Sequence, residues 1–98
     1  MGKRGFVYIM SNARRTVLYV GVTSDLAGRM GKHKTKFYAK SFSAQYNVDR
    51  LVYFEELDSM TKAIAREKQL KAGSRTQKEK LINSINPAWD DLMIHPPA

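Results

Sequence analysis

Two short apolar segments near the start of the chain decide the fold: FVYIM at residues 6–10 and VLYVGV at residues 17–22. Both are rich in β-branched and aromatic residues, which favour β-strands. The polar residues 11–15, SNARR, separate them as a hairpin turn would. The chain is therefore predicted to begin with an antiparallel ribbon.

The pairing of these two strands decides where their tyrosines lie. If Met10 pairs with Val17, Tyr8 stands directly opposite Tyr19, and two phenols project side by side from one face of the ribbon. A slip of one residue would break that arrangement. We expect the register that places Tyr8 opposite Tyr19.

The composition indicates one small globular domain. The chain has 98 residues, of which 43% are hydrophobic, and it has no cysteine for disulfides or thiolate metal sites. No run approaches the ~20 apolar residues of a membrane span, and the N-terminus lacks the apolar core of a signal peptide. We expect a cytoplasmic protein without a membrane partner.

The net charge of +8 is unevenly distributed. Residues 1–40 carry nine basic side chains against the single acid Asp25, whereas residues 41–98 carry eight of each sign. This asymmetry favours a polyanionic partner, because each neutralised phosphate releases counterions. The alternative is that the basic residues only keep a small domain soluble.

A helix should follow the hairpin. It would begin at Asp25, with Thr23 or Ser24 as its cap. Its apolar stripe toward the core would consist of Leu26, Met30 and His33. Residues 36–47 then mix basic and aromatic side chains, and we expect a loop with a short helix at residues 41–46.

A third strand and two more helices complete the pattern. Residues 50–57, RLVYFEEL, are apolar on both faces in their middle, which predicts a strand buried within the sheet. The next helix should run over residues 60–72, capped by Asp58 or Ser59 and stopped by Gly73. A last helix would open with a capping box of Ser74 and Gln77 and end before Pro87, after which Trp89 and Leu92 fold back onto the domain.

The predicted fold class is α/β. A small, three-stranded, mainly antiparallel sheet would be flanked by helices in a single domain over residues 1–92. Residues 93–98, which include two prolines, are predicted to form a frayed tail.

Glu67 interrupts the apolar stripe of the helix at residues 60–72. That stripe is formed by Met60, Ala63, Ile64 and Leu70, and the position that would continue it is Glu67. A carboxylate on an inward face is costly unless it is paired or binds a cation. An ion pair with a lysine or arginine at the edge of the stripe is the structural alternative.

Taken together, these residues resemble the GIY-YIG nuclease domain. FVY at residues 6–8 stands where that family has GIY, and YVG at residues 19–21 stands where it has YIG. Arg29 matches an arginine on the first helix of the family, His33 a histidine of its Slx1-like branch, and Glu67 a glutamate on the helix after the third strand. The resemblance extends from residue 6 to about residue 89 and is closest to small stand-alone bacterial members, which are also related to the amino-terminal domain of UvrC.

The resemblance implies a metal-dependent endonuclease that cleaves DNA, in repair or recombination. Its catalytic residues would be Tyr8, Tyr19, Arg29, His33 and Glu67, and Glu67 would hold a single Mg²⁺ or Mn²⁺ ion. We expect DNA contacts from Arg14, Arg15, Thr23, Lys32, Lys34, Lys36 and Lys71. A late asparagine of the family corresponds to either Asn83 or Asn86, and the sequence does not choose between them.

The chemistry of these side chains suits phosphodiester hydrolysis. A hard cation prefers oxygen ligands and keeps several waters, so one carboxylate can suffice. Arg29 can grip phosphate oxygens. Tyr8 would be the general base if nearby cations stabilise its phenolate, with Tyr19 orienting the water or Tyr8, and His33 would share proton transfer or bind phosphate.

Two other functions compete with the nuclease. One is a basic nucleic-acid-binding module with a decayed active site, and the other is an accessory partner in a larger repair complex. A homodimer presenting two sites is a further expectation for so small a domain. Cleavage that requires a divalent metal would distinguish the enzyme from both competitors.

Overall fold

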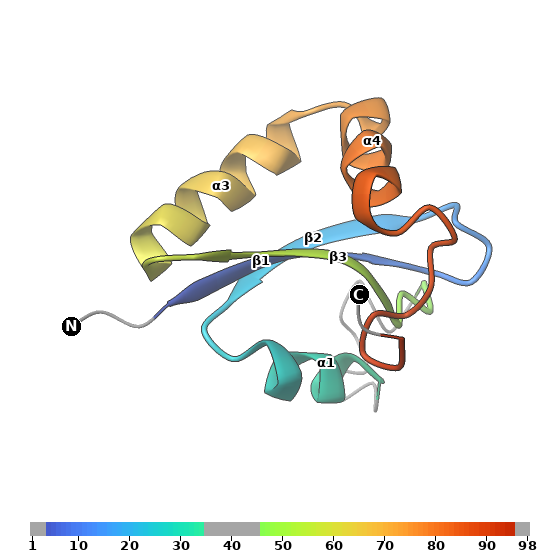
Figure 1. The fold of residues 1–98 in the computed structure, drawn as a ribbon, viewed down its shortest axis with the longest axis horizontal. Coiled ribbons are helices and arrows are strands. Elements are labelled where there is room, and N and C mark those ends of the chain that lie inside the picture. The colour runs from blue at the N-terminus through green and yellow to red at the C-terminus, as the bar shows by residue number, and fades with distance from the viewer. Residues whose placement is uncertain (1–3, 35–45, 96–98) are drawn as a thin grey trace.

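The computed structural model describes residues 4–34 and 46–95, without the side chains of residues 32–34. In chain order, the elements are β1 (Gly5–Ser11), β2 (Leu18–Thr23), α1 (Leu26–Lys34), β3 (Arg50–Leu57), α3 (Met60–Ala72) and α4 (Arg75–Ile85). The strands form an antiparallel sheet in the order β2-β1-β3. Helix α1 covers one face, and α3 and α4 cover the other (Figure 1). The predicted fold class is confirmed, whereas the short helix expected at residues 41–46 lies outside the described residues.

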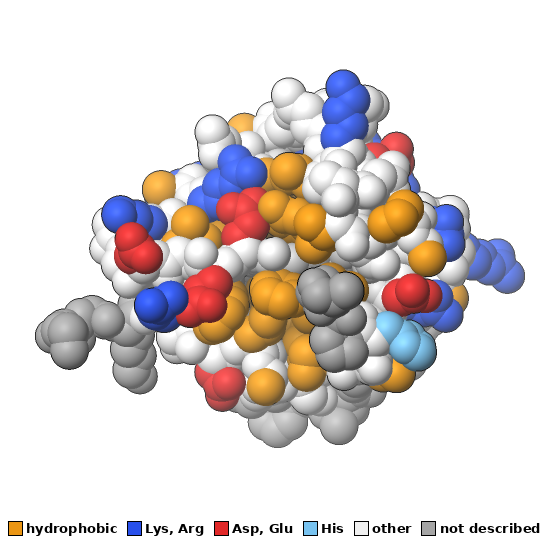
Figure 2. All heavy atoms as spheres, viewed as in Figure 1, with side chains coloured by type: hydrophobic (Ala, Val, Ile, Leu, Met, Phe, Trp, Pro, Cys, Tyr) orange, Lys and Arg blue, Asp and Glu red, His pale blue; other side chains and the backbone are white. Residues whose placement is uncertain are grey.

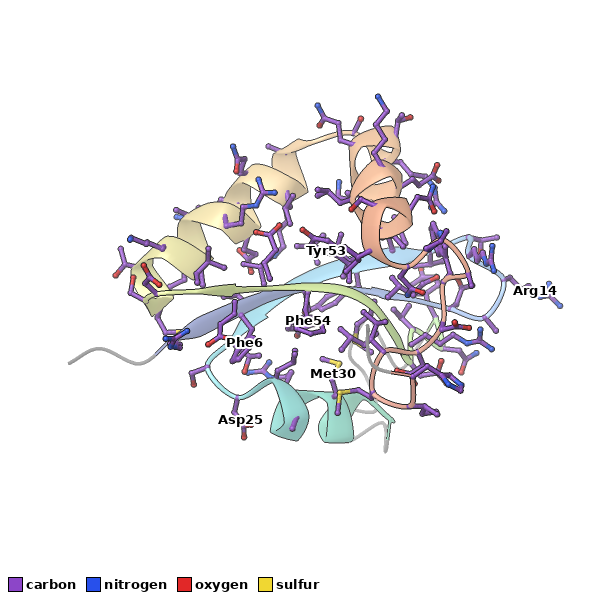
Figure 3. The ribbon with its side chains drawn as sticks, viewed as in Figure 1. Phe6, Arg14, Asp25, Met30, Tyr53 and Phe54 are labelled. Atoms are coloured by element: carbon purple, nitrogen blue, oxygen red, sulfur yellow. The ribbon has the colours of Figure 1, made fainter. Side chains whose placement is uncertain are left out.

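The central strand β1 is buried on both faces. Val7 belongs to the core beneath α3 and α4, and Tyr8 belongs to a second cluster on the α1 side. Successive side chains of a strand point to opposite faces, and the same alternation places Tyr53 and Phe54 of β3 on opposite sides of the sheet (Figure 3). Two covered faces explain why the first strand is an unbroken apolar run.

The third strand occupies residues 50–57 as predicted, but it lies at the edge of the sheet. The segment after α4 nevertheless covers the start of its outer edge. Leu92 N–H donates to the Leu51 carbonyl (2.8 Å), and Asn86 Nδ2 donates to the Val52 carbonyl (3.1 Å). The apolar pattern predicted burial correctly, but it could not show that a loop, rather than a strand, supplies the cover.

The predicted register of the hairpin is wrong by two residues. Met10 pairs with Tyr19, and Tyr8 pairs with Gly21. Because side chains alternate with a period of two, this shift leaves every side chain on its expected face. The two tyrosines therefore still share one face of the ribbon, as diagonal rather than direct neighbours.

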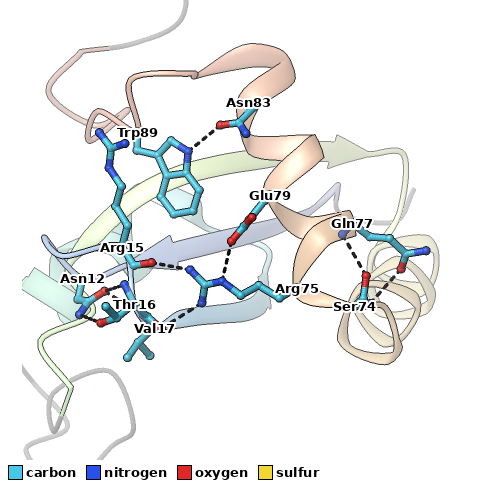
Figure 4. Close-up of polar contacts among 10 residues, drawn as sticks. All are labelled: Asn12, Arg15, Thr16, Val17, Ser74, Arg75, Gln77, Glu79, Asn83 and Trp89. Carbon is cyan, nitrogen blue, oxygen red and sulfur yellow. Dashed lines mark hydrogen bonds and ion pairs between the residues drawn. The ribbon is translucent and has the colours of Figure 1, made fainter.

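The turn between β1 and β2 causes this shift. The Asn12 carbonyl accepts the Arg15 N–H at 3.1 Å, and Asn12 Oδ1 accepts the N–H groups of Thr16 (2.9 Å) and Val17 (3.0 Å) (Figure 4). Arg15 takes a positive φ of 61° inside this turn. Val17 is therefore part of the turn, and strand pairing begins one residue later.

Helix α1 begins one residue later than predicted, because Asp25 is its cap. The Asp25 carbonyl accepts the Arg29 N–H (3.0 Å), and Asp25 Oδ1 accepts the Gly28 N–H (3.1 Å). Thr23 supports this arrangement, since its hydroxyl accepts the Asp25 N–H at 3.1 Å. Helical residues then begin at Leu26.

The limits of α3 and α4 agree with the sequence signals. Ser59 is the N-cap of α3, Gly73 ends it, and Ser74 and Gln77 form the predicted capping box of α4. The expected apolar stripe of α3 is wrong at Ile64, which is 40% exposed. None of the described helices is long and apolar enough to cross a membrane.

The residues after α4 fold back onto the domain, as predicted. Trp89 and Leu92 are both buried, at 6% and 5% exposure. Trp89 Nε1 donates to Asn83 Oδ1 at 2.8 Å (Figure 4). Within the predicted tail, the N–H groups of Ile94 and His95 donate to the Asp91 carbonyl, and residues 96–98 lie outside the described part of the chain.

Candidate active site

Tyr8 and Gly21 form one steric unit at the middle of the ribbon. The Tyr8 side chain is fully buried. A Cβ atom placed on Gly21 would overlap the ring and the hydroxyl of Tyr8. The glycine of the second motif therefore leaves the space that the tyrosine of the first motif occupies.

Tyr19 lies beside Tyr8 on the same face of the sheet. The two ring centroids are 6.3 Å apart, with the ring planes inclined at 42°. This tilted arrangement is an ordinary and favourable geometry for an aromatic pair. The predicted pairing of the phenols in space is thus present, although their strand register is not the predicted one.

The Tyr8 phenol is surrounded by other residues that the sequence nominated. Burial raises the pKa of Tyr8 well above its usual value of 10, and the charges of Tyr19 and Glu67 raise it further. The Arg29 guanidinium lowers the pKa of Tyr8, through its charge and a side-chain hydrogen bond, but does not outweigh burial. We call these four residues, Tyr8, Tyr19, Arg29 and Glu67, the Tyr8 cluster, in which the Tyr8 phenol is protonated at neutral pH.

Glu67 approaches this cluster from helix α3. Its side chain is 15% exposed, and its Oε2 lies 3.4 Å from Nζ of Lys71, one turn later. Because Lys71 is 54% exposed, such a contact contributes little, about 0–1 kcal/mol. The structural alternative of a lysine partner is therefore present, but it holds the carboxylate only loosely.

Known proteins share both this sequence pattern and this fold. A sequence model of the GIY-YIG catalytic domain matches residues 4–80. The chain belongs to the GIY-YIG family of nuclease domains. It is 32% identical over 84 residues to the UPF0213 protein of Syntrophus aciditrophicus (86% of this chain, 94% of that protein). It is 36% identical over 77 residues to a UPF0213 protein of Natronomonas pharaonis (79% and 88%).

A solved structure resembles this GIY-YIG domain as well. The solution NMR structure of a UPF0213 protein from Bacillus halodurans is 28% identical in sequence and superposes with a TM-score of 0.51. The similarity covers 82% of this chain and 83% of the other. The family and the three-stranded architecture thus agree.

The DNA contacts expected from the hairpin turn divide into two kinds. Arg14 is exposed at the tip of the turn and projects away from the domain (Figure 3). The Arg15 guanidinium instead lies 5.6 Å from the centre of the Trp89 ring and donates to the Ala88 carbonyl at 2.7 Å. Arg15 is therefore already engaged in holding the turn against the C-terminal segment.

The other expected contacts fall into three groups. Thr23 is 6% exposed, and its hydroxyl is engaged at the start of α1. Lys71 faces Glu67, as described above. The side chains of Lys32, Lys34 and Lys36 lie outside the described residues, so the DNA contacts expected of them remain predictions. The side chain of His33 lies outside them too, and its expected catalytic role also remains a prediction.

Both late asparagines of this GIY-YIG domain bond to the segment that follows α4. Asn83 Oδ1 accepts the Trp89 indole N–H. Asn86 is 5% exposed, donates through Nδ2 to the Val52 carbonyl and to the Asp90 carbonyl, and accepts the Asp90 N–H at 3.0 Å. Both amides hold the C-terminal turn in place.

Sequence reasoning missed a second polar group, which lies on the α3 side of the sheet. Tyr53 donates to Glu55 Oε2 at 2.6 Å, Arg66 donates to both Glu55 oxygens at 3.0–3.2 Å, and Arg66 Nη1 donates to Gln69 Oε1 at 2.6 Å. We call these four residues the Glu55 cluster. The signal in the sequence was the spacing of Tyr53 and Glu55, which places both on one face of a strand.

The hydrogen bonds of the Glu55 cluster shift its pKa values in opposite directions. Burial raises the pKa of the Glu55 carboxyl, but hydrogen bonds from Arg66 and Tyr53 outweigh it and hold that pKa below its usual value. Burial and the bond to Glu55 raise the pKa of the Tyr53 phenol. The cluster is therefore stable with its acid ionised and its phenol protonated.

Proposed function

We propose that this chain is a divalent-metal-dependent endonuclease that hydrolyses phosphodiester bonds of DNA. The observation that carries the proposal is the Tyr8 cluster, in which a second tyrosine, an arginine and a carboxylate act on one buried phenol. Membership of the GIY-YIG family supports the nuclease activity, and the resemblance implies a role in DNA repair or recombination. A cytoplasmic location is part of the proposal.

The donor set at the cluster suits a hydrated cation rather than a cage of protein ligands. Among the described residues, no group of three or more histidine, cysteine or acidic side chains could hold a metal ion. Glu67 is a loosely paired carboxylate beside a phenol. Mg²⁺ and Mn²⁺ accept one or two carboxylates and keep several waters. Glu67 would hold such a cation, which would supply charge for the phosphate and an acidified water.

The side chains of the cluster then have distinct tasks. Arg29 would bind the non-bridging phosphate oxygens, since its guanidinium presents a fork of donors. Tyr8 would accept the proton of the attacking water only as a phenolate, so its own proton would first have to pass to solvent. Burial and the charge of Glu67 raise the pKa of Tyr8 and oppose this loss, whereas Arg29 lowers that pKa and favours it. Neutralising the charge of Glu67 therefore favours the phenolate. Tyr19 would orient the Tyr8 hydroxyl from the side.

A cleavage assay with matched glutamate variants tests this proposal. Labelled duplex, nicked, flap, branched and single-stranded DNA would be incubated with Mg²⁺, Mn²⁺ or EDTA. Wild-type protein should cleave only with metal. Glu56→Gln should behave like wild type, because Glu56 is an exposed surface residue paired with Arg4. Glu67→Gln should not cleave.

Three results would overturn the proposal. Cleavage in EDTA, or undiminished cleavage by Glu67→Gln, would show that Glu67 does not serve a metal-dependent reaction. DNA binding without cleavage under every condition would instead indicate the basic binding module or the accessory partner. Sedimentation of the same preparation would report whether the protein is a homodimer.

A further inference from the structure

A groove separates α3 from α4 on the side of the sheet that carries the Glu55 cluster. It has a volume of about 360 Å³. Figure 2 shows hydrophobic side chains exposed between the two helices. The groove is lined by Arg66, Gln69, Leu70, Gly73, Gln77, Lys78, Lys80, Leu81 and Ser84.

The charged lining of this groove is entirely positive. Arg66 is bound to Glu55, and Lys78 Nζ donates to the Gly73 carbonyl at 2.7 Å. Lys80 is exposed, and the structure gives it no bonding partner within residues 4–34 and 46–95. The chain from residue 60 to residue 85 carries seven basic side chains against Glu67 and Glu79. The occupant of the groove should therefore be an anion.

The remaining lining indicates which kind of anion. Leu70 and Leu81 offer an apolar surface, and the amides of Gln69 and Gln77 stand beside it. The phosphates of a double helix need no apolar floor, and a base that stays paired cannot enter a hollow of this size. An unpaired nucleotide has both a flat ring face and a phosphate, and it suits a site of this mixed character.

The position of the groove on α3 connects it to the Tyr8 cluster. Arg66 lines the groove and its neighbour Glu67 belongs to the cluster, so the two sites occupy adjacent faces of one helix. A strand that leaves Glu67 has to cross only the width of α3, about 10 Å, to reach the groove. An acidic peptide would match the charge, but nothing brings a peptide to this helix as the proposed reaction brings DNA.

We propose that the groove between α3 and α4 binds an unpaired nucleotide of the strand that is cut at the Tyr8 cluster. This inference rests on the proposed function and deepens it. It assigns to the protein DNA substrates that carry a single-stranded segment next to the cleavage point, such as flaps and branches.

Binding measurements on an inactive protein test the groove separately from catalysis. Glu67→Gln protein in EDTA would be titrated with a fluorescent single-stranded oligonucleotide and with a duplex of equal length. Ser84→Trp, added to this background, fills the groove without changing charge, because Ser84 is an exposed lining residue. Thr76→Trp is the matched control, since Thr76 is exposed on the same helix but does not line the groove.

Ser84→Trp should weaken single-strand binding about tenfold, the loss expected from one stacked base, and leave duplex binding within about twofold. Thr76→Trp should change neither. Lys80→Glu should weaken single-strand binding more than Lys68→Glu, which alters net charge equally from an exposed position outside the groove. Melting curves would show that each variant is folded.

Equal single-strand affinity of Ser84→Trp and Thr76→Trp would overturn the assignment. Displacement of the oligonucleotide by an acidic peptide of the same length and charge, at the same concentration as competing DNA, would reassign the groove to a protein partner. If the protein does not cleave DNA with metal, in contrast, the nuclease proposal fails. Binding of single-stranded DNA by the groove, measured in EDTA, would still stand.

Discussion

The Tyr8 cluster and the Glu55 cluster contain the same three residue types, a tyrosine, an arginine and a glutamate, but their carboxylates differ in how they are bonded. Glu55 accepts hydrogen bonds at 2.6–3.2 Å from a phenol and a guanidinium. Within the described part of the chain, Glu67 has one lysine contact, at 3.4 Å. Residue types alone therefore do not distinguish a structural group from one proposed to be reactive. The distinction lies in how completely the carboxylate is already hydrogen-bonded.

The largest contrast should come from removing each charge in turn. Glu67→Gln should lower the cleavage rate about 1,000-fold, with the melting temperature unchanged or raised, because a half-buried carboxylate need no longer be desolvated. Glu55→Gln should keep activity but leave the charge of Arg66 without its ion-pair partner. Since the pair is about a quarter exposed, we expect a loss of about 1–2 kcal/mol, or roughly 5–15 °C in melting temperature.

Cleavage rates and thermal melts of the two variants check this prediction. Glu56→Gln, on the exposed surface, serves as the control for both readouts. A destabilised Glu67→Gln protein that still cuts DNA would place Glu67 among the structural residues and remove the contrast between the clusters.

Removing the Tyr8 hydroxyl should affect cleavage, whereas removing the Tyr53 hydroxyl should affect stability. Tyr8→Phe removes the proposed proton acceptor and should reduce cleavage about 100-fold or more while DNA affinity is retained. Tyr53→Phe removes a hydrogen bond to a charged acceptor and should cost about 1 kcal/mol of stability with normal cleavage. Single-turnover rates and urea unfolding measure the two effects. A fully active Tyr8→Phe enzyme would show that Tyr8 contributes packing and not catalysis.

Stability should depend on pH at both ends of the scale. The pKa of Glu55 is lowered, so its contribution is present above its usual value of about 4.5 and is lost as the pH falls below that value. The pKa values of Tyr8 and Tyr53 are raised, so their contributions are complete below about pH 10 and are lost as the pH rises above it.

Variants assign the two limbs of this profile. The acid limb should flatten in Glu55→Gln, and the alkaline limb should become less steep in Tyr8→Phe and in Tyr53→Phe. Unfolding free energies measured from pH 3 to pH 11 check both. An unchanged acid limb in Glu55→Gln would mean that other carboxylates govern acid unfolding.

The smallest effects are expected in the hairpin turn, where the Arg14 side chain is exposed and the Arg15 side chain is bonded to the C-terminal segment. Arg15→Ala should cost about 1 kcal/mol, because it loses the Trp89 ring and the Ala88 carbonyl. Arg14→Ala should leave stability within about 0.5 kcal/mol. It should also lower the slope of log affinity against log salt for DNA by about one. The opposite assignment of the two effects would show that Arg15 leaves Trp89 to bind DNA.

Local signals allowed much of the fold to be predicted. Apolar periodicity located the three strands, and the Ser74–Gln77 capping box located the start of α4. The hairpin register could not be derived, because it depends on how the Asn12 side chain folds the turn. The same applies to Arg15, since its partner Trp89 is distant in sequence and only the folded chain brings them together.

Residues of the candidate site could be predicted from the sequence, but their side-chain contacts could not. Tyr8, Tyr19 and Glu67 could be named from strand and helix patterns together with a family resemblance. The sequence could not show that the Tyr8 ring lies against Gly21, or that Lys71 stands within 3.4 Å of Glu67. Both are matters of side-chain direction, which residue spacing constrains only to a face.

The cover over the outer edge of β3 has a consequence for how copies of this protein behave at high concentration. An uncovered edge strand is a template onto which another chain can add, and such addition has no natural limit. Here Asn86, Asp91 and Leu92 occupy the hydrogen-bonding positions of Leu51 and Val52 that an incoming strand would need. A chain cut after Ile85 would expose them. Such a truncated chain should aggregate through its exposed edge strands. Turbidity, rather than a melting curve, would detect this aggregation.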